Sequence, residues 1–232
     1  MTSTSAQKQS LTTARITGVW YLVLAISGMV GFLLLHPKIY ISADPEKTLA
    51  NLTMHVTLAR IRLLLEFAII LSQALAAVWF YKLFKPVSDW GAWALGVWGM
   101  MNAAAILLSA ISMGSAIEIA ISSNLPKDDK IVSIQLLGQL IKHSWGAGGL
   151  FFGLWLLPMG YMVVLSKRMP VWLGRFLILG GIGYILSTFA TYSGFVNPWL
   201  EYIVIPATIG EFWMIGYLLL FGIRPLVEQS EV

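Results

Sequence analysis

Four polar residues recur at helical spacing within one otherwise apolar segment of the chain. His55, Arg62, Glu66 and Gln73 are separated by 7, 4 and 7 positions, and at about 3.6 residues per turn this spacing places them along one stripe of a helix. Arg62 and Glu66 lie four residues apart and can pair directly. Two interpretations stay open: a buried structural pair that holds helices together, or a polar pocket that is reached from the outer face of a membrane.

Three further polar residues are candidates for the same pocket. Asn102, His143 and Glu211 each lie in, or at the start of, a different apolar segment. We expect them to form the set of ligand-pocket residues together with Arg62 and Glu66, because a charge near the centre of a bilayer costs at least about 2.5–3.5 kcal/mol unless it is paired or hydrated. One sequence does not show whether these residues converge, and it identifies no catalytic residue.

The three histidines suggest a second arrangement. His36, His55 and His143 fall at the outer ends of predicted spans, and with Glu66 or Glu211 they could supply nitrogen and oxygen ligands for zinc. Their spacing has no short metal-binding signature, and histidines at helix ends are ordinary. We therefore expect no metal and no cofactor.

The composition indicates that lipid is the solvent for most of this chain. Of 232 residues, 58% are hydrophobic and only 11% are charged, whereas a soluble domain has about 25% charged residues. Apolar stretches of about 20 residues recur, which is the length that crosses a hydrocarbon core of about 30 Å. The sequence predicts an all-α integral membrane bundle of about six transmembrane helices in a single domain, residues 1–232. The absence of cysteine excludes disulfides and thiolate metal sites.

The expected elements follow from where apolar runs start and stop. A helix should begin at Asp44 and Pro45 and continue through His55 into the second span. Pro158 and Pro206 are expected to lie inside spans and kink them. The six predicted spans cover residues of about 16–35, 59–81, 90–121, 144–165, 176–190 and 200–223.

The distribution of basic residues predicts how the chain crosses the cell membrane. Lys and Arg are dense in the termini and in the short connectors of one side, whereas on the other side they are mixed with acids in longer connectors. Both termini are therefore expected in the cytoplasm. The dense set comprises Lys8, Arg15, Lys82, Lys85, Lys167, Arg168, Arg175 and Arg224, and the outer set comprises Lys38, Lys47, Lys127, Lys130 and Lys142.

The formal net charge of +4 is small. In a bilayer protein such a charge reflects basic residues at the cytoplasmic face, so we expect no nucleic-acid partner. The expected partners are the lipid bilayer and a small-molecule or lipid ligand. No feature of the sequence indicates an oligomeric state.

The chain resembles a bacterial family of membrane proteins known as domain of unknown function 4386. The likeness begins with ARITGVWYL at residues 14–22, is densest from His143 through GGLFFG at residues 148–153, and ends with IPATIGE at residues 205–211. The resemblance implies a multi-span membrane protein and brings no activity. Family members more often have aspartate where this chain has Glu66. The positions that match the family pattern are Arg15, Arg62, Glu66, His143 and Glu211.

Two functions from different classes are compatible with these residues. The first is a non-enzymatic binding, sensing or transport-type protein, whose outward-facing polar pocket holds a small molecule or lipid. Six spans without a clear inverted repeat favour binding over active transport. The alternative is a membrane-embedded hydrolase with Glu66 or Glu211 as general base and His143 as acid or as ligand to a metal.

Overall fold

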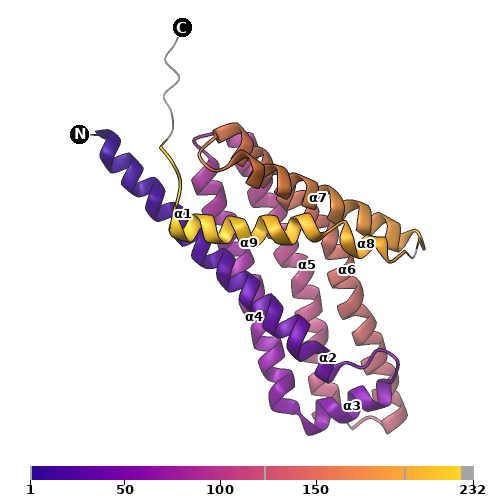
Figure 1. Ribbon diagram of the computed structural model, residues 1–232. Helices are drawn as coiled ribbons and strands as arrows, with labels where there is room; N and C mark the ends of the chain where they lie inside the picture. The colour runs from indigo at the N-terminus through magenta and orange to yellow at the C-terminus, as the bar shows by residue number, and fades with distance from the viewer. Residues whose placement is uncertain (1, 123, 196, 226–232) are drawn as a thin grey trace. The chain divides into compact units, whose positions relative to one another are not determined.

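The computed structural model describes residues 2–122, 124–195 and 197–225, with side chains from Ser5 onward, and these residues contain helices and no strand. Apolar runs of this length become helices in lipid because a helix satisfies its own backbone hydrogen bonds. In chain order (Figure 1) the helices are α1 (Thr2–Gly28), the π-helix η1 (Met29–Leu35), α2 (His36–Ile39), α3 (Pro45–Met54), α4 (Val56–Phe84), α5 (Asp89–Ser122), α6 (Lys127–Ser166), α7 (Val171–Tyr192), α8 (Trp199–Tyr202) and α9 (Ile205–Leu220).

Six helical segments are long and apolar enough to cross a membrane, which confirms the predicted all-α membrane bundle. The first five are longer than the predicted spans because helical structure continues into the polar ends, whereas the sixth ends at Leu220, before the predicted end at residue 223. The first segment includes η1 and α2, and the fourth includes the amphipathic turns before residue 144. The segments are Ser5–Ile39, Val56–Phe84, Asp89–Ser122, Lys127–Ser166, Val171–Tyr192 and Trp199–Leu220.

The prediction of one continuous helix from Asp44 into the second span is wrong. Asp44 does cap α3, because its side chain accepts a hydrogen bond from the Lys47 N–H at 2.9 Å. The chain then leaves helical geometry at His55, which has φ −116° and ψ 40°. Asn51 holds α3 against the preceding segment by donating to the carbonyl oxygens of Lys38 and Ile39, each at 3.2 Å. These tertiary contacts orient α3 separately from α4.

The predicted kink at Pro206 is also wrong. Pro206 lies in the first turn of α9, where the missing N–H would have no helical partner in any case. The predicted sixth span is divided into α8 and α9 by residues 203 and 204. Pro158, in contrast, lies inside α6 as expected.

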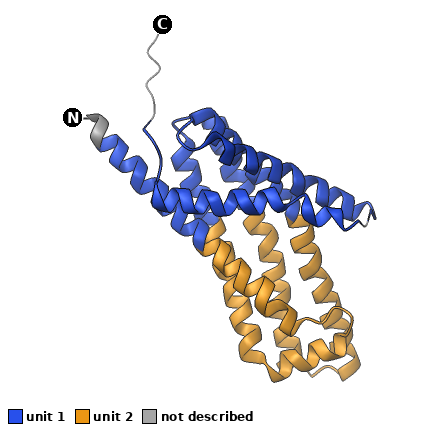
Figure 2. Cartoon of the chain, viewed as in Figure 1, with its two compact units in different colours: residues 1–22, 74–101, 149–232 blue, residues 23–73, 102–148 orange. Residues whose placement is uncertain are grey.

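The chain forms two compact units (Figure 2). Unit 1 comprises residues 1–22, 74–101 and 149–232, and unit 2 comprises residues 23–73 and 102–148. Four helices, α1, α4, α5 and α6, contribute residues to both units. A single domain over residues 1–232 stays a prediction.

Unit 1 is packed through small residues. A Cβ added at Gly180 of α7 would overlap the backbone of Ala207 in α9, and one added at Gly153 of α6 would lie 2.6 Å from the carbonyl oxygen of Gly181 in α7. Close backbone approach of this kind is how helices associate in lipid without a hydrophobic driving force.

Unit 2 has its own apolar core. Ile39 of α2, Leu52 of α3, Met113 of α5 and Ile134 of α6 are all fully or almost fully buried in one cluster. The cluster joins the short helices α2 and α3 to the long helices of this unit. It therefore supports the segment between α2 and α3, which forms part of the site described next.

Candidate functional site

Arg62 and Glu66 form a buried ion pair on α4 in unit 2. Their side chains are only 1% and 2% exposed. Arg62 Nη1 contacts Glu66 Oε2, and Arg62 Nη2 donates to Glu66 Oε1 at 3.4 Å. Two charges four residues apart on a helix can meet in this way, and their pairing offsets part of the cost of removing each from water.

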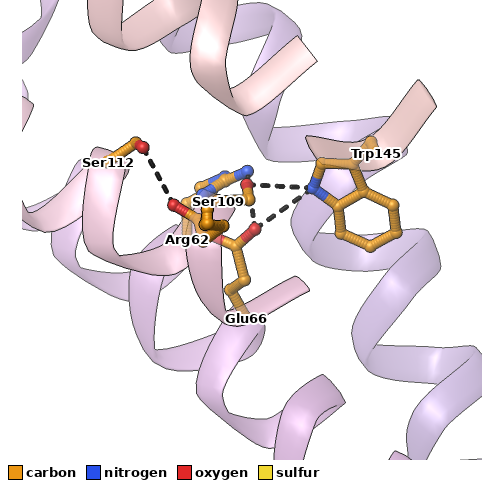
Figure 3. Close-up of polar contacts among 6 residues, drawn as sticks. Arg62, Glu66, Ser109, Ser112 and Trp145 are labelled. Atoms are coloured by element: carbon orange, nitrogen blue, oxygen red, sulfur yellow. Dashed lines mark hydrogen bonds and ion pairs between the residues drawn. The ribbon is translucent and has the colours of Figure 1, made fainter. Parts of the chain in front are cut away.

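Two residues from other helices complete the surroundings of Glu66. The indole N–H of Trp145, on α6, donates to Glu66 Oε1 at 3.2 Å and to the Ser109 hydroxyl oxygen, on α5, at 3.1 Å. Figure 3 shows these side chains directed toward one another from three helices. Ser109 is fully buried. The pair is therefore part of a network that joins α4, α5 and α6.

A second polar pair lies further along α4. Asn102 Nδ2, on α5, donates to Gln73 Oε1 at 3.2 Å, and both side chains are fully buried. The other amide atoms, Gln73 Nε2 and Asn102 Oδ1, have no partner among the described residues. Buried amide groups of this kind cost free energy until they are paired.

Unit 2 contains a cavity of about 390 Å³, which we call the unit 2 cavity. Its volume lies within the range of about 300–1,000 Å³ that is usual for small-molecule sites. Its walls come from η1, α2, α3, α6 and the segment between α2 and α3. The lining residues are Phe32, His36, Tyr40, Ile41, Ser42, Pro45, Thr48, Ile134, Gln135, Gly138, Gln139, Lys142 and Trp145.

One wall of the unit 2 cavity is a row of three aromatic rings, which we call the aromatic row: Phe32, His36 and Tyr40. The Phe32 and His36 ring centroids are 4.9 Å apart with planes 7° apart, and the His36 and Tyr40 centroids are 5.1 Å apart with planes 17° apart. The ring centroids of Phe32 and Trp145 are 4.5 Å apart. The row begins in the π-helix η1, a rare structure that is frequent at functional sites.

Two polar atoms of the aromatic row are buried without a partner. His36 Nδ1 and the Tyr40 hydroxyl make no hydrogen bond within the described part of the chain. Burial raises the pKa of the Tyr40 hydroxyl well above its usual value, while the charges of Arg62 and Glu66 act on it in opposite directions. The hydroxyl therefore stays neutral and able to donate.

The opposite wall is a polar face of α6. Gln135, Gln139 and Lys142 are spaced 4 and 3 residues apart, which places them on one side of the helix. None of them makes a side-chain hydrogen bond or ion pair among the residues that the structure describes. Trp145 follows on the same face, so this residue belongs both to the cavity wall and to the network around Glu66.

The structure distributes the predicted pocket residues over several environments. Arg62 and Glu66 lie together, Asn102 pairs with Gln73, and His143 is exposed on α6. Glu211 belongs to unit 1, where its Oε1 accepts a hydrogen bond from the Tyr21 hydroxyl at 2.7 Å. Within the described ranges, no group of three or more His, Cys, Asp or Glu side chains could hold a metal ion.

Sequence reasoning missed most of the residues that line the unit 2 cavity. Spacing could have indicated two of its walls, because Phe32, His36 and Tyr40 recur every four residues and Gln135, Gln139 and Lys142 share a helical face. No signal in the sequence indicated that the two faces meet.

Comparisons with known proteins identify relatives without a described activity. A family model described as domain of unknown function (DUF4386) matches residues 16–222. An uncharacterized protein of Archaeoglobus fulgidus is 31% identical over 68 residues, which are 29% of this chain and 42% of that protein. The chain thus aligns with less than half the length of that relative. No solved structure matches the chain.

Proposed function

The chain belongs to the membrane-protein family described as domain of unknown function (DUF4386), and we propose that it is a non-enzymatic binding protein that holds a small amphipathic molecule in the unit 2 cavity. The observation that carries this proposal is the pair of unpartnered buried atoms, His36 Nδ1 and the Tyr40 hydroxyl, in the wall of that cavity. A bound molecule would supply the hydrogen bonds that both atoms lack.

The chemistry of the lining supports binding over hydrolysis. Glu66, which is hydrogen-bonded to the lining residue Trp145, is 2% exposed and already engaged by Arg62. A general base must reach the proton that it removes, whereas Glu66 is buried and is not among the residues that line the cavity. Aromatic walls with a few polar groups are the usual composition of a ligand site.

The proposed pocket faces the outer side of the cell membrane. This orientation rests on the density of Lys and Arg in the short connectors and termini. The segment between α2 and α3 and the start of α6 then lie on the outer side. Ligand would enter from the outer aqueous phase or from the outer leaflet.

Filling the cavity tests the proposal. Gly138 lines the unit 2 cavity, and a Cβ at this position would lie 3.1 Å from the Tyr40 ring. Gly138→Leu should therefore close the cavity. Gly28→Leu is the matched control, because a Cβ at Gly28 of α1 meets nothing within 4 Å.

Both variants would be purified in nanodiscs and titrated by calorimetry with amphipathic probes of three charge types: 4-phenylbutyrate, 4-phenylbutanol and 4-phenylbutylamine. We expect at least one probe to bind the wild type and Gly28→Leu and to lose binding in Gly138→Leu. Equal binding to all three proteins would show that the cavity is not the site. Turnover of an ester probe that depends on Glu66 would contradict the non-enzymatic assignment.

A further inference from the structure

The polar side chains that line the unit 2 cavity supply several hydrogen-bond donors, one of them cationic. Lys142 contributes an ammonium group, Gln135 and Gln139 contribute amide N–H groups, and Tyr40 contributes a hydroxyl. No aspartate or glutamate is among the lining residues. The lining is thus complementary to an oxygen anion and offers no carboxylate to a cation.

The carboxylate beneath the wall does not alter this balance. Glu66 does not line the cavity and is paired with Arg62, so the two opposite charges compensate each other. Lys142 is then the uncompensated charge of the lining. It lies three residues from Trp145 and three from Gln139 on the same face of α6.

The aromatic row indicates what the apolar part of the ligand packs against. Neighbouring rings are stacked, with centroids 4.9 Å and 5.1 Å apart and planes 7° and 17° apart, so the row is a stack of apolar rings and not one flat face. An apolar or aromatic body packs favourably against such a stack, since edge-to-face contacts between rings are favourable. The unpartnered Tyr40 hydroxyl lies at the end of this row, where it can donate to an oxygen atom of the ligand.

We propose that the ligand is an organic carboxylate with an apolar body, which rests against the aromatic row while its carboxylate binds Lys142 and the neighbouring Gln139 amide. This inference rests on the proposed function and names its ligand class. A single lysine matches a singly charged carboxylate better than a doubly charged phosphate monoester. Such a molecule could be a soluble aromatic acid or a fatty acid from the membrane, and both carry the same chemistry.

The test compares probes that share one carbon skeleton and differ in charge. The full chain in nanodiscs of zwitterionic lipid would be titrated with 4-phenylbutyrate, 4-phenylbutanol and 4-phenylbutylamine, and separately with decanoate and decanol. We expect the carboxylate to bind at least about tenfold more tightly than the alcohol, since charge-assisted hydrogen bonds are the stronger ones. Preference for phenylbutyrate over decanoate would indicate a soluble aromatic acid, and the reverse would indicate a fatty acid.

Substitutions of Lys142, which is proposed to bind the ligand carboxylate, test the charge preference of the cavity. Lys142→Gln should abolish the preference for the carboxylate, and Lys142→Glu should reverse it in favour of the amine. Lys38→Glu is the matched control, because Lys38 is an exposed lysine of unit 2 that does not line the cavity. Gln139→Glu provides a second route, since it places a negative charge next to Lys142 and should weaken carboxylate binding about tenfold.

The possible results separate this inference from the proposed function. If all three probe types bind equally, and binding is lost in Gly138→Leu but unchanged in the Lys142 variants, the carboxylate assignment is wrong and the binding function stands. If no probe binds the wild type, both proposals fail. Reversal of preference in Lys142→Glu but not in Lys38→Glu would establish the carboxylate site.

Discussion

Trp145 and Glu66 share a hydrogen bond of 3.2 Å that connects the wall of the unit 2 cavity to the buried ion pair. The Trp145 ring faces the cavity while its N–H faces Glu66 and Ser109. A ligand that packs on the Trp145 ring therefore contacts a side chain that is held in place by Glu66 of α4 and Ser109 of α5. The hydrogen bonds to Glu66 and Ser109 thus fix the orientation of Trp145 in the cavity wall.

The first prediction concerns the stability of the Arg62 and Glu66 pair. Glu66→Leu alone should lower the free energy of unfolding by about 3–5 kcal/mol, because Arg62 then remains as an uncompensated buried charge. The double variant Arg62→Met with Glu66→Leu should cost less than either single change. Unfolding of the four proteins of this mutant cycle in bicelles would measure the coupling.

An exposed pair provides the control for this cycle. Lys85 and Asp89 are also four residues apart, at 3.9 Å, but their side chains are 56% and 76% exposed, so removing either should change stability little. A different result at Glu66 would be informative. If Glu66→Gln keeps full stability and abolishes probe binding, Glu66 contacts the ligand in a hydrated pocket and is not a structural ion-pair partner.

A second prediction addresses the acid in unit 1. Tyr21 is 2% exposed and its hydroxyl donates to Glu211 at 2.7 Å, so Tyr21→Phe should remove this bond while keeping the ring that contacts Phe80 and Trp155. We expect a loss of about 1–3 kcal/mol in unfolding free energy. Tyr202→Phe, at a tyrosine that is 59% exposed, should have little effect. Equal effects of the two changes would contradict a role for the Tyr21 hydroxyl.

Helical periodicity explains why part of the site was predictable. The spacing of Arg62, Glu66 and Gln73 depends on one helix alone, and all three side chains are buried on α4 as the stripe implied. The prediction is wrong for the fourth member, His55, which is exposed at the break between α3 and α4. Periodicity does not show which face of another helix meets that stripe. The structure was therefore needed to identify the partners of this stripe, Ser109, Trp145 and Asn102. Of these, only Asn102 was predicted to belong to the pocket.

The cavity itself was beyond sequence reasoning for a different physical reason. Its walls depend on backbone that departs from regular helix, namely the π-helix η1, the segment between α2 and α3, and the break at His55. These departures are set by tertiary contacts such as those of Asn51. Local propensity carries little information about them.

A third prediction tests the close packing of α7 on α9 in unit 1. A Cβ at Gly180 would overlap the backbone of Ala207, so Gly180→Ala must move the two helices apart and should destabilise the protein by at least about 1–3 kcal/mol. Gly216→Ala is the matched control, because its Cβ meets nothing within 4 Å and alanine favours the helix. Thermal unfolding in detergent would compare them. A neutral Gly180→Ala would exclude tight packing at this position.

The last prediction concerns the orientation in the membrane. Both termini should be cytoplasmic, and residues 37–53 and 124–140 should face outside, because dense Lys and Arg near span ends are retained on the cytoplasmic side. An even number of crossings, as the six candidate helices would give, places both ends of the chain on one side, so the two termini provide one test and the connector at residues 37–53 provides an independent one. Alkaline phosphatase fusions, active only outside, should be active in this connector and inactive at both ends. Green fluorescent protein fusions, fluorescent only inside, should give the opposite pattern. Active phosphatase at the C-terminus would reverse the orientation, and the unit 2 cavity would then draw its ligand from the cytoplasm.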